Sequence, residues 1–217
     1  MKKNVLILSG PTHEYFDPVR FIGNASSGLM GKALAEEAVA RGYDVDFVSG
    51  PVAKANLPRL ETTGNIHQVV SAEEMLAKAA ELFPAAAVII FAAAVADYAP
   101  AEKQSEKMAK SDGELLLRLR PTPDLAKTLC ATKQTGQTAI GFALQTADGE
   151  ACARRKLEGK NLDGIVLNSP ASLGAATGTF GFLAAGAAEF DHWGCIGKNE
   201  CAKKIFNALE RASIRLA

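Results

Sequence analysis

The sequence is poor in cysteine, and no two cysteines stand in the CxxC spacing of a zinc site. Its four cysteines are Cys130, Cys152, Cys195 and Cys201. Disulfide frameworks and structural zinc sites need cysteines in larger numbers or in close pairs, so neither is indicated. We expect each cysteine to be a small buried hydrophobic residue in a reduced protein.

A net charge and hydrophobic runs long enough to cross a membrane are also missing. The 24 Lys and Arg residues balance the 24 Asp and Glu residues, which leaves no basic surplus to attract nucleic acid. The apolar run VLIL near the N-terminus is far shorter than an export signal or a membrane span requires. The sequence also has no low-complexity linker and no long-period repeat. We therefore expect a single domain over residues 1–217, located in the cytoplasm, with no nucleic-acid or membrane partner.

Short apolar runs alternate with helical patterns along most of the chain. VLILSG is followed by a helix expected from about Ser27 to Arg41 and then by VDFVSG, which makes one strand, helix, strand unit. The run AAAVIIFAAAV is apolar on both faces, as in a central parallel strand covered by helices on both sides. TAIGFAL and DGIVLN continue the alternation. The pattern predicts an α/β fold with a doubly wound, mostly parallel, Rossmann-like sheet and helices on both faces.

Polar residues mark where two further helices begin. Ser71 with Glu74 forms a capping box for a helix that runs to about Phe83. The tripeptide Thr122-Pro123-Asp124 predicts an N-cap at its threonine and a proline in the first turn of the next helix. Both helices fall between apolar runs, as the alternating pattern requires.

Two stretches depart from the alternation and predict antiparallel additions. Between Lys107 and Arg120, an Asp112-Gly113 turn separates two candidate strands. Residues 179–193 read as a second hairpin or an antiparallel edge before a final helix. We expect these hairpins to extend a mostly parallel sheet.

The standard phosphate-binding motifs fail when they are tested against this sequence. Gly23 and Gly28 have the spacing of a P-loop, but Leu29 follows where a lysine is required. The dinucleotide fingerprint is incomplete, and the second strand ends without a ribose-binding acid. Tyr98 is followed four residues later by Glu102, so a YxxxK pair is missing as well. An NAD(P)-dependent reductase remains only as an alternative.

The helix start near Asn24 still offers an anion site. Backbone N–H groups, the hydroxyls of Ser26 and Ser27 and the positive end of a helix are available there. The guanidinium of Arg20 can hold a phosphate with two hydrogen bonds, and the Asn24 amide can donate to a developing oxyanion. An ordinary N-cap is the alternative interpretation.

Other loops at the same end of the predicted sheet carry matching chemistry. Asp97 follows the most buried strand, where it could accept hydrogen bonds from a base or a sugar. Lys107 and Lys110 precede the predicted turn, and Lys156 and Lys160 lie four apart on one helix face. Four lysines can form an ordinary solvated surface. Their recurrence at this end is also what a triphosphate would need.

Six separated motifs together resemble the phosphopantothenoylcysteine synthetase family, the phosphopantothenate–cysteine ligases of coenzyme A biosynthesis. They are SGPTHEYFDPVRFIGNASSGLMG, AAAVADYAP, EKMAK, PTPDLA, GFALQT and ARRKLEGKNLDGIVLN, and the similarity runs from about Val5 to Asn168. The resemblance implies that the carboxylate of 4′-phosphopantothenate attacks CTP and releases pyrophosphate. Cysteine then displaces CMP from the acyl-cytidylate. The pattern is closer to CTP-using bacterial members than to ATP-using eukaryotic ones.

The resemblance also implies roles for individual residues. Asn24, Lys107 and Arg20 match catalytic positions. Magnesium is expected to arrive with the nucleotide, because no dedicated carboxylate cage for a metal is evident. The positions expected to bind the nucleotide are Gly10, Ser26, Ser27, Gly28, Phe91, Ala92, Ala93, Asp97, Lys107, Pro123, Asp124, Leu125, Ala126, Phe142, Lys156 and Lys160.

Partners follow from the same resemblance. Members of this family form homodimers in which a segment near Lys107 crosses toward the neighbour's site. Many bacterial members are fused to a flavin-dependent decarboxylase, so we expect a stand-alone synthetase with a separate decarboxylase as a possible partner. Leu29, Ala109 and Gln145 depart from residues usual in the family. A non-catalytic, nucleotide-binding paralogue is therefore the alternative to an active ligase.

Overall fold

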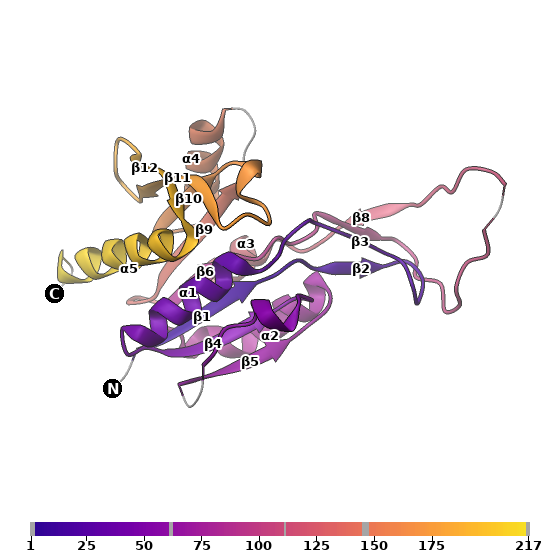
Figure 1. The fold of residues 1–217 in the computed structure, drawn as a ribbon, viewed down its shortest axis with the longest axis horizontal. Coiled ribbons are helices and arrows are strands. Elements are labelled where there is room, and N and C mark those ends of the chain that lie inside the picture. Colours follow the sequence, from indigo (N-terminus) through magenta and orange to yellow (C-terminus); the bar gives the residue numbers. More distant parts are fainter. Residues whose placement is uncertain (1–2, 61–62, 111, 145–147, 216–217) are drawn as a thin grey trace.

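The computed structural model describes residues 3–60, 63–110, 112–144 and 148–215, and its centre is one eight-stranded sheet (Figure 1). The strand order is β12-β11-β10-β9-β6-β1-β4-β5. The six strands from β10 to β5 in this order run parallel, and β11 and β12 add an antiparallel edge. The predicted doubly wound sheet is confirmed. The strand bounds are β1 Asn4–Ser9, β4 Asp44–Ser49, β5 Gly64–Gln68, β6 Val88–Phe91, β9 Thr138–Leu144, β10 Gly164–Asn168, β11 Thr177–Ala184 and β12 Asp191–Gly197.

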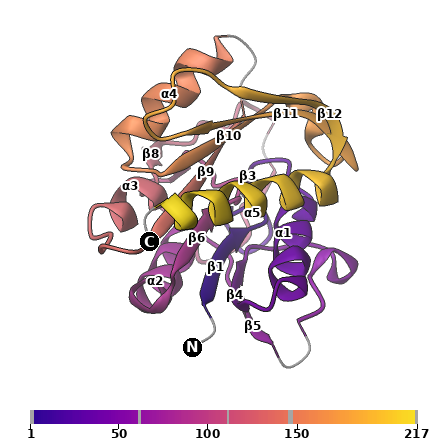
Figure 2. The same ribbon diagram turned by 90° about the vertical axis from the view of Figure 1, so that its left-hand side faces the viewer.

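Helices cover both faces of this sheet, as Figure 2 shows. Residues of α2, α3 and α4 pack into one buried cluster, and residues of α1 and α5 pack into the other. In the part of the chain that the structure describes, no helix is long and apolar enough to cross a membrane. The helices are α1 Leu29–Ala40, α2 Ala72–Leu82, α3 Leu125–Cys130, α4 Gly149–Gly159 and α5 Lys198–Arg215, with 3₁₀ turns at Lys54–Asn56, Phe83–Ala85 and Pro170–Ser172.

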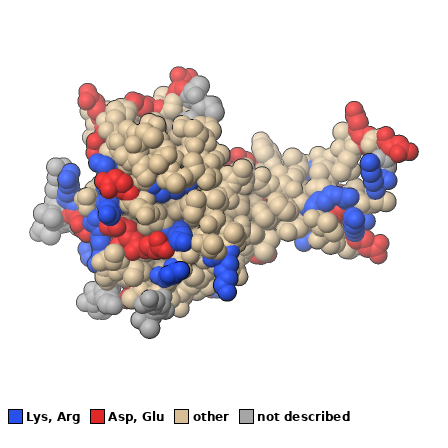
Figure 3. All heavy atoms as spheres, viewed as in Figure 1, with Lys and Arg blue, Asp and Glu red and all other residues tan. Residues whose placement is uncertain are grey.

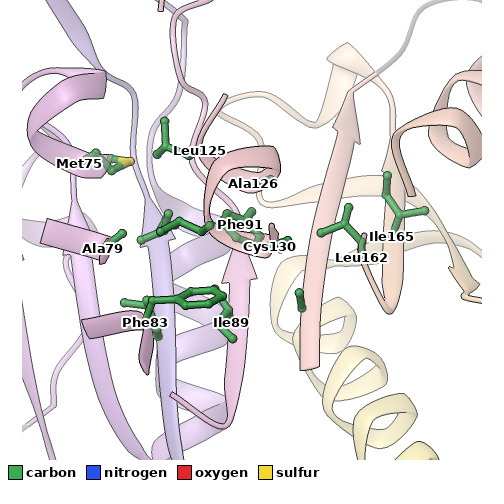
Figure 4. Close-up of a cluster of buried hydrophobic side chains, with 14 of the residues drawn as sticks. Met75, Ala79, Phe83, Ile89, Phe91, Leu125, Ala126, Cys130, Leu162 and Ile165 are labelled. Atoms are coloured by element: carbon green, nitrogen blue, oxygen red, sulfur yellow. The ribbon is translucent and has the colours of Figure 1, made fainter. Parts of the chain in front are cut away.

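The central strands are buried on both faces because their side chains alternate between two cores. In β1, Leu6 and Leu8 belong to the cluster under α2, α3 and α4, while Val5 and Ile7 belong to the cluster under α1 and α5. Figure 4 shows the first cluster, in which Phe91 of β6 lies beside side chains of α3. This two-sided burial explains the continuous apolar runs in the sequence.

The helix starts follow the sequence signals, with one shift. Ser71 Oγ accepts a hydrogen bond from the Glu74 N–H at 3.2 Å, so the predicted start of α2 is confirmed. At α3 the N-cap is Asp124 rather than Thr122, because the Asp124 carboxylate accepts a bond from the Lys127 N–H at 3.1 Å. The prediction of Thr122 as N-cap was wrong by two residues.

An arm projects from the body to the right in Figure 1, and its described residues are 13–23, 98–110 and 112–121. In it, β2 (His13–Tyr15) pairs with β3 (Phe21–Gly23), and β7 (Tyr98–Pro100) pairs with β8 (Leu119–Pro121). The hairpin expected between Lys107 and Arg120 was therefore wrong: β8 pairs with β7 across the arm. The described residues of 101–118 form no strand, and their mostly exposed side chains offer no buried face that would favour one.

The C-terminal hairpin and two of the cysteines agree with the sequence. β11 and β12 form the predicted antiparallel edge before α5. Burial raises the pKa of Cys130 to about 11 and that of Cys201 to about 12, as expected for inert buried thiols. Cys152 is half-buried and Cys195 is exposed, so burial was wrongly expected for them. Cys195 lies on β12, which is the edge strand of the sheet and has open surroundings.

Asp17 ties two segments of the arm together. Its fully buried carboxylate accepts bonds from the backbone N–H groups of Val19 (2.8 Å), Arg20 (2.7 Å) and Met108 (3.3 Å). The Arg20 guanidinium pairs with this carboxylate at 2.6 Å and also donates to the Met108 carbonyl at 3.1 Å. Burial alone would raise the pKa of Asp17, but these hydrogen bonds lower it to about 2. The segment that carries Lys107 is thereby tied to the turn between β2 and β3.

Replacing Asp17 with asparagine is expected to destabilise the protein in a pH-dependent manner. The folded-state pKa of about 2 lies below the ordinary 3.8, so the stability from this carboxylate is fully present above 3.8 and is lost as the pH falls through 2. The urea midpoint of Asp17→Asn should lie below that of the wild type near neutral pH, and the difference should shrink on acidification. The exposed Asp112→Asn is the matched control and should leave the midpoint unchanged. A difference that stays constant down to a pH of about 2 would contradict this assignment.

Candidate functional site

A cavity of about 660 Å³ lies at the carboxyl ends of β6 and β9. The chain leaves β1 toward β4 on one side and returns to β6 on the other, so this is the edge where open α/β sheets bind ligands. Its lining brings together residues from motifs that are far apart in the sequence. The residues expected at the site that line this cavity are Asn24, Phe91, Ala93, Asp97, Pro123, Asp124, Leu125, Ala126, Phe142, Lys156 and Lys160.

Hydrogen bonds fix the loop that follows β6 along one wall of this cavity. The Ala94 N–H donates to the Gly10 carbonyl at 2.8 Å, and the Ala96 N–H donates to Thr12 Oγ1 at 3.0 Å. Asn24 Nδ2 donates to the Val95 carbonyl at 2.8 Å. Since an amide NH₂ has two hydrogens, Asn24 keeps a second donor beside the cavity.

Asp124 and Lys160 form an ion pair on another wall, with Nζ and Oδ2 2.9 Å apart. Partial burial would raise the pKa of Asp124, but the bonds from Lys160 and from the Lys127 N–H lower it, so the carboxylate stays ionised. Lys156 lies one turn before Lys160 on α4 and is half-buried. Its ammonium has no hydrogen bond or ion pair with the described residues. The α4 helix therefore presents one paired and one unpaired cation to the cavity.

A second cavity, of about 140 Å³, adjoins the first and lies at the start of α1. Six of the residues expected to bind nucleotide line it: Ser26, Ser27, Gly28 and Ala92, together with Ala93 and Phe142, which also line the first cavity. Gly28 has a positive φ of 75° and no side chain to cap the helix, so the first N–H groups of α1 are left uncapped. The long loop before α1 is explained by the β2–β3 hairpin that it contains.

Three expected site residues lie elsewhere. Gly10 makes the turn after β1 with a φ of 78°, and an added Cβ would lie 3.0 Å from the Gly50 carbonyl oxygen. Arg20 is engaged by Asp17, and Lys107 is exposed on the arm, so neither lines the two cavities. Gln145 lies outside the described residues. The binding and catalytic roles of all these residues stay predictions.

Several lining residues were not expected from the sequence. Thr122, Leu162 and Leu173 line the large cavity, while Asn168 and Lys198 line the small one. Lys198 follows β12 at the far end of the chain, outside every quoted motif. The only signal in the sequence was a lysine at a strand-to-helix junction, which is common on protein surfaces.

Metal ligands are not grouped at this edge. In residues 3–60, 63–110, 112–144 and 148–215, no three His, Cys, Asp or Glu side chains are placed to hold a metal ion together. A metal at this site would therefore need most of its ligands from a bound molecule.

Comparison with known proteins finds relatives that include proteins named for coenzyme A biosynthesis. The bifunctional coenzyme A biosynthesis protein CoaBC of Bacillus subtilis (strain 168) is 43% identical over 176 residues, which are 81% of this chain and 42% of that protein. A protein named cysteine/cysteine sulfinic acid decarboxylase, from an unknown prokaryotic organism, is 45% identical over 176 residues, 81% of this chain and 48% of that protein. The chain spans less than half the length of these curated relatives.

Solved structures agree with this placement. The C-terminal domain of a CoaBC protein has a TM-score of 0.82 and 35% identity, covering 98% of this chain and 96% of that one. A Cab2 mutant in complex with phosphopantothenate-cysteine has a TM-score of 0.77 over 98% of this chain and 88% of that one. At 17% identity, this second likeness shows the fold alone.

A family model described as the DNA/pantothenate metabolism flavoprotein C-terminal domain matches residues 1–212. The match covers nearly the whole chain and agrees with the sheet order and the shared motifs. It confirms the family that the motifs indicated. The chain belongs to the DNA/pantothenate metabolism flavoprotein C-terminal domain family.

Proposed function

We propose that the protein is a phosphopantothenate–cysteine ligase that joins 4′-phosphopantothenate to cysteine in coenzyme A biosynthesis. The observation that carries the proposal is the large cavity, where an amide, two carboxylates and two lysines from separate motifs converge: Asn24, Asp97, Asp124, Lys156 and Lys160. Its volume of about 660 Å³ lies in the usual range for small-molecule sites. Family membership supports the same reaction class.

The proposed reaction has two steps, because a carboxylate is a poor acyl donor until one of its oxygens joins a good leaving group. The carboxylate of 4′-phosphopantothenate attacks the α-phosphorus of CTP, and pyrophosphate leaves as the acyl-cytidylate forms. The amine of cysteine then attacks the acyl carbon, and CMP leaves. Holding the reactants together in one cavity supplies much of the rate enhancement through proximity.

The chain's own residues would orient the reactants and stabilise charge. Lys156 is free to meet the nucleotide, and the Asp124–Lys160 pair offers both a donor and an acceptor beside it. The second Nδ2 hydrogen of Asn24 would donate to oxygen that gains charge during acyl transfer. Mg²⁺ would accompany the nucleotide, whose phosphate oxygens would supply most of its ligands.

The arm supports a homodimer as the working form of the ligase. It exposes large apolar side chains, which monomeric proteins seldom gather on one projection: Val19, Phe21, Tyr98, Leu115, Leu116 and Leu119. On the face shown in Figure 3, uncharged surface covers the arm between the body and a charged far end. Lys107 lines neither of its own chain's cavities, and a second copy would allow it to reach a neighbouring site.

Two further points concern partners and alternatives. A decarboxylase as a partner is supported by the bifunctional name of the CoaBC relatives and by the relative that is named a decarboxylase, since this chain matches less than half of each. The bacterial motif pattern favours CTP over ATP. A non-catalytic, nucleotide-binding paralogue would bind CTP without turnover, whereas an NAD(P)-dependent reductase would bind a nicotinamide nucleotide.

Purified protein with 4′-phosphopantothenate and Mg²⁺ is expected to release pyrophosphate with CTP and to form CMP only when cysteine is added. Lys107→Ala should reduce pyrophosphate release by about 100-fold or more, as when a transition-state donor is removed. Asn24→Ala should release pyrophosphate but stall before cysteine addition. Both steps can be followed by quantifying pyrophosphate and CMP.

The matched control is Lys103→Ala, which removes another exposed arm lysine and should keep wild-type turnover. If the folded protein binds CTP but releases no pyrophosphate with either CTP or ATP, the ligase proposal is wrong. The non-catalytic, nucleotide-binding paralogue would then be the better interpretation. Binding of a nicotinamide nucleotide instead would favour the reductase.

Leu116→Glu is expected to separate the dimer, because Leu116 is 88% exposed on the arm and a buried carboxylate there would be costly. Light scattering should give the mass of one chain, and turnover should fall with it. Ile66→Glu changes an exposed apolar residue on β5, away from the arm, and should keep both mass and turnover. A wild-type protein that is monomeric and active would overturn the dimer.

A further inference from the structure

Lys198, the first residue of α5, is a buried lysine that the proposed reaction has not yet used. Its side chain is only 9% exposed and lines the 140 Å³ cavity at the start of α1. The ammonium makes no hydrogen bond or ion pair with the described residues, and burial lowers its pKa. A buried cation without a partner costs folding free energy, and an anion bound beside it would offset that cost.

Other residues that line the same cavity supply neutral donors. The first residues of α1, Leu29 to Gly31, line it together with Ser26 and Ser27. The helix has 12 residues, its N-cap Gly28 offers no side-chain cap, and its dipole places positive potential at this end. A cation and the uncapped start of a helix therefore line the same small cavity.

A further polar atom in this cavity lacks a partner. Asn168 lines it, and Asn168 Oδ1 is buried without a hydrogen bond in the part of the chain that the structure describes. Buried polar atoms are normally satisfied, so this acceptor leaves a place for a water that donates to it beside a bound ligand. The volume of about 140 Å³ is several times the roughly 10–15 Å³ that one water requires.

The small cavity continues into the large one. The two share five lining residues: Ala93, Ala94, Phe142, Leu144 and Leu173. One ligand can therefore extend from the large cavity into the small one. A nucleoside triphosphate has the matching form, with a bulky nucleoside at one end and anionic phosphates at the other.

We propose that Lys198 and the uncapped start of α1 hold the two terminal phosphates of the nucleotide and then the departing pyrophosphate. This inference rests on the proposed ligase function. In the first step a bond forms between the substrate carboxylate oxygen and the α-phosphorus, and the bond from that phosphorus to the bridging oxygen breaks. The electron pair stays on pyrophosphate, and Lys198 balances the negative charge that it gains.

The phosphate of 4′-phosphopantothenate has the same chemistry and is the other possible occupant. The test is calorimetric titration of the purified full chain with inorganic pyrophosphate, with 4′-phosphopantothenate and with CMP. Lys198→Met should weaken pyrophosphate binding by about tenfold or more, the usual effect of losing a charge-assisted hydrogen bond. Binding of CMP and of 4′-phosphopantothenate should change less than about twofold.

Two controls separate binding from folding. Lys203→Met removes an exposed lysine from the same helix and should leave pyrophosphate binding unchanged. Lys198→Met should melt at or above the wild-type temperature, since it replaces an unpaired buried charge with an apolar chain of similar length. Added pyrophosphate should raise the melting temperature of the wild type and of Lys203→Met. The increase for Lys198→Met should be much smaller.

The inference is overturned if the wild type does not bind pyrophosphate, or if Lys198→Met binds it as well as the wild type does. It is also overturned if Lys198→Met weakens the binding of 4′-phosphopantothenate and leaves the binding of pyrophosphate unchanged. These titrations require no turnover. They therefore give an answer even if the ligase reaction fails. If the wild type is an active ligase and Lys198→Met binds pyrophosphate as the wild type does, this inference is rejected while the proposed function stands.

Discussion

The parallel pairing of β1 with a strand on each side is the constraint on which the rest of the structure depends. Leu8 stands opposite Val48 of β4 on one side and Phe91 of β6 on the other. Because the strands run in the same direction, the connections after them emerge at one edge, and those after β1 and β6 diverge there. Both cavities open at this edge, and the Ala94 to Gly10 hydrogen bond joins the two connections.

Charge at this edge is arranged by pairing some groups and leaving others unpaired. Lys160 is paired with Asp124, and Arg20 is paired with Asp17. Lys156 and Lys198 have no such partner among the described residues, and they line different cavities. A paired cation is fixed in place and largely neutralised, whereas an unpaired cation can meet an incoming anion. The pairing pattern therefore shows which cations are free to meet an anion directly and which would contact a ligand only as part of an ion pair, and their positions in the sequence cannot show this.

Sequence patterns predicted the sheet well where burial dictates composition. The strands β1, β4, β6, β9 and β10 are buried and read as apolar runs. The strand β5, with the sequence GNIHQ, was missed because it is a mostly exposed edge with one large apolar residue. The short strands of the arm were also missed, because three residues are too few to show a period and their partners are distant in the sequence.

Site residues that belong to sequence motifs could be predicted, whereas those that tertiary packing brings to the site could not. Residues in quoted motifs, such as Asp124 and Phe142, line the large cavity as a set. Arg20 looked like a phosphate ligand, yet its guanidinium is bound to Asp17 three residues away, which the residue types alone could not reveal. Lys198 reaches the edge because α5 begins next to β12 and packs on the α1 side of the sheet, a consequence of the whole topology.

The arm is held to the rest of the structure by fixed contacts and is not a loose extension of the chain. Since the pKa of the buried Asp17 carboxylate is about 2, titration near neutral pH does not remove the charge that joins the β2–β3 turn to Met108. β3 ends at Gly23, and Asn24 follows across one peptide bond. The arm and the large cavity therefore meet at Asn24, whose backbone continues the arm and whose side chain borders the cavity.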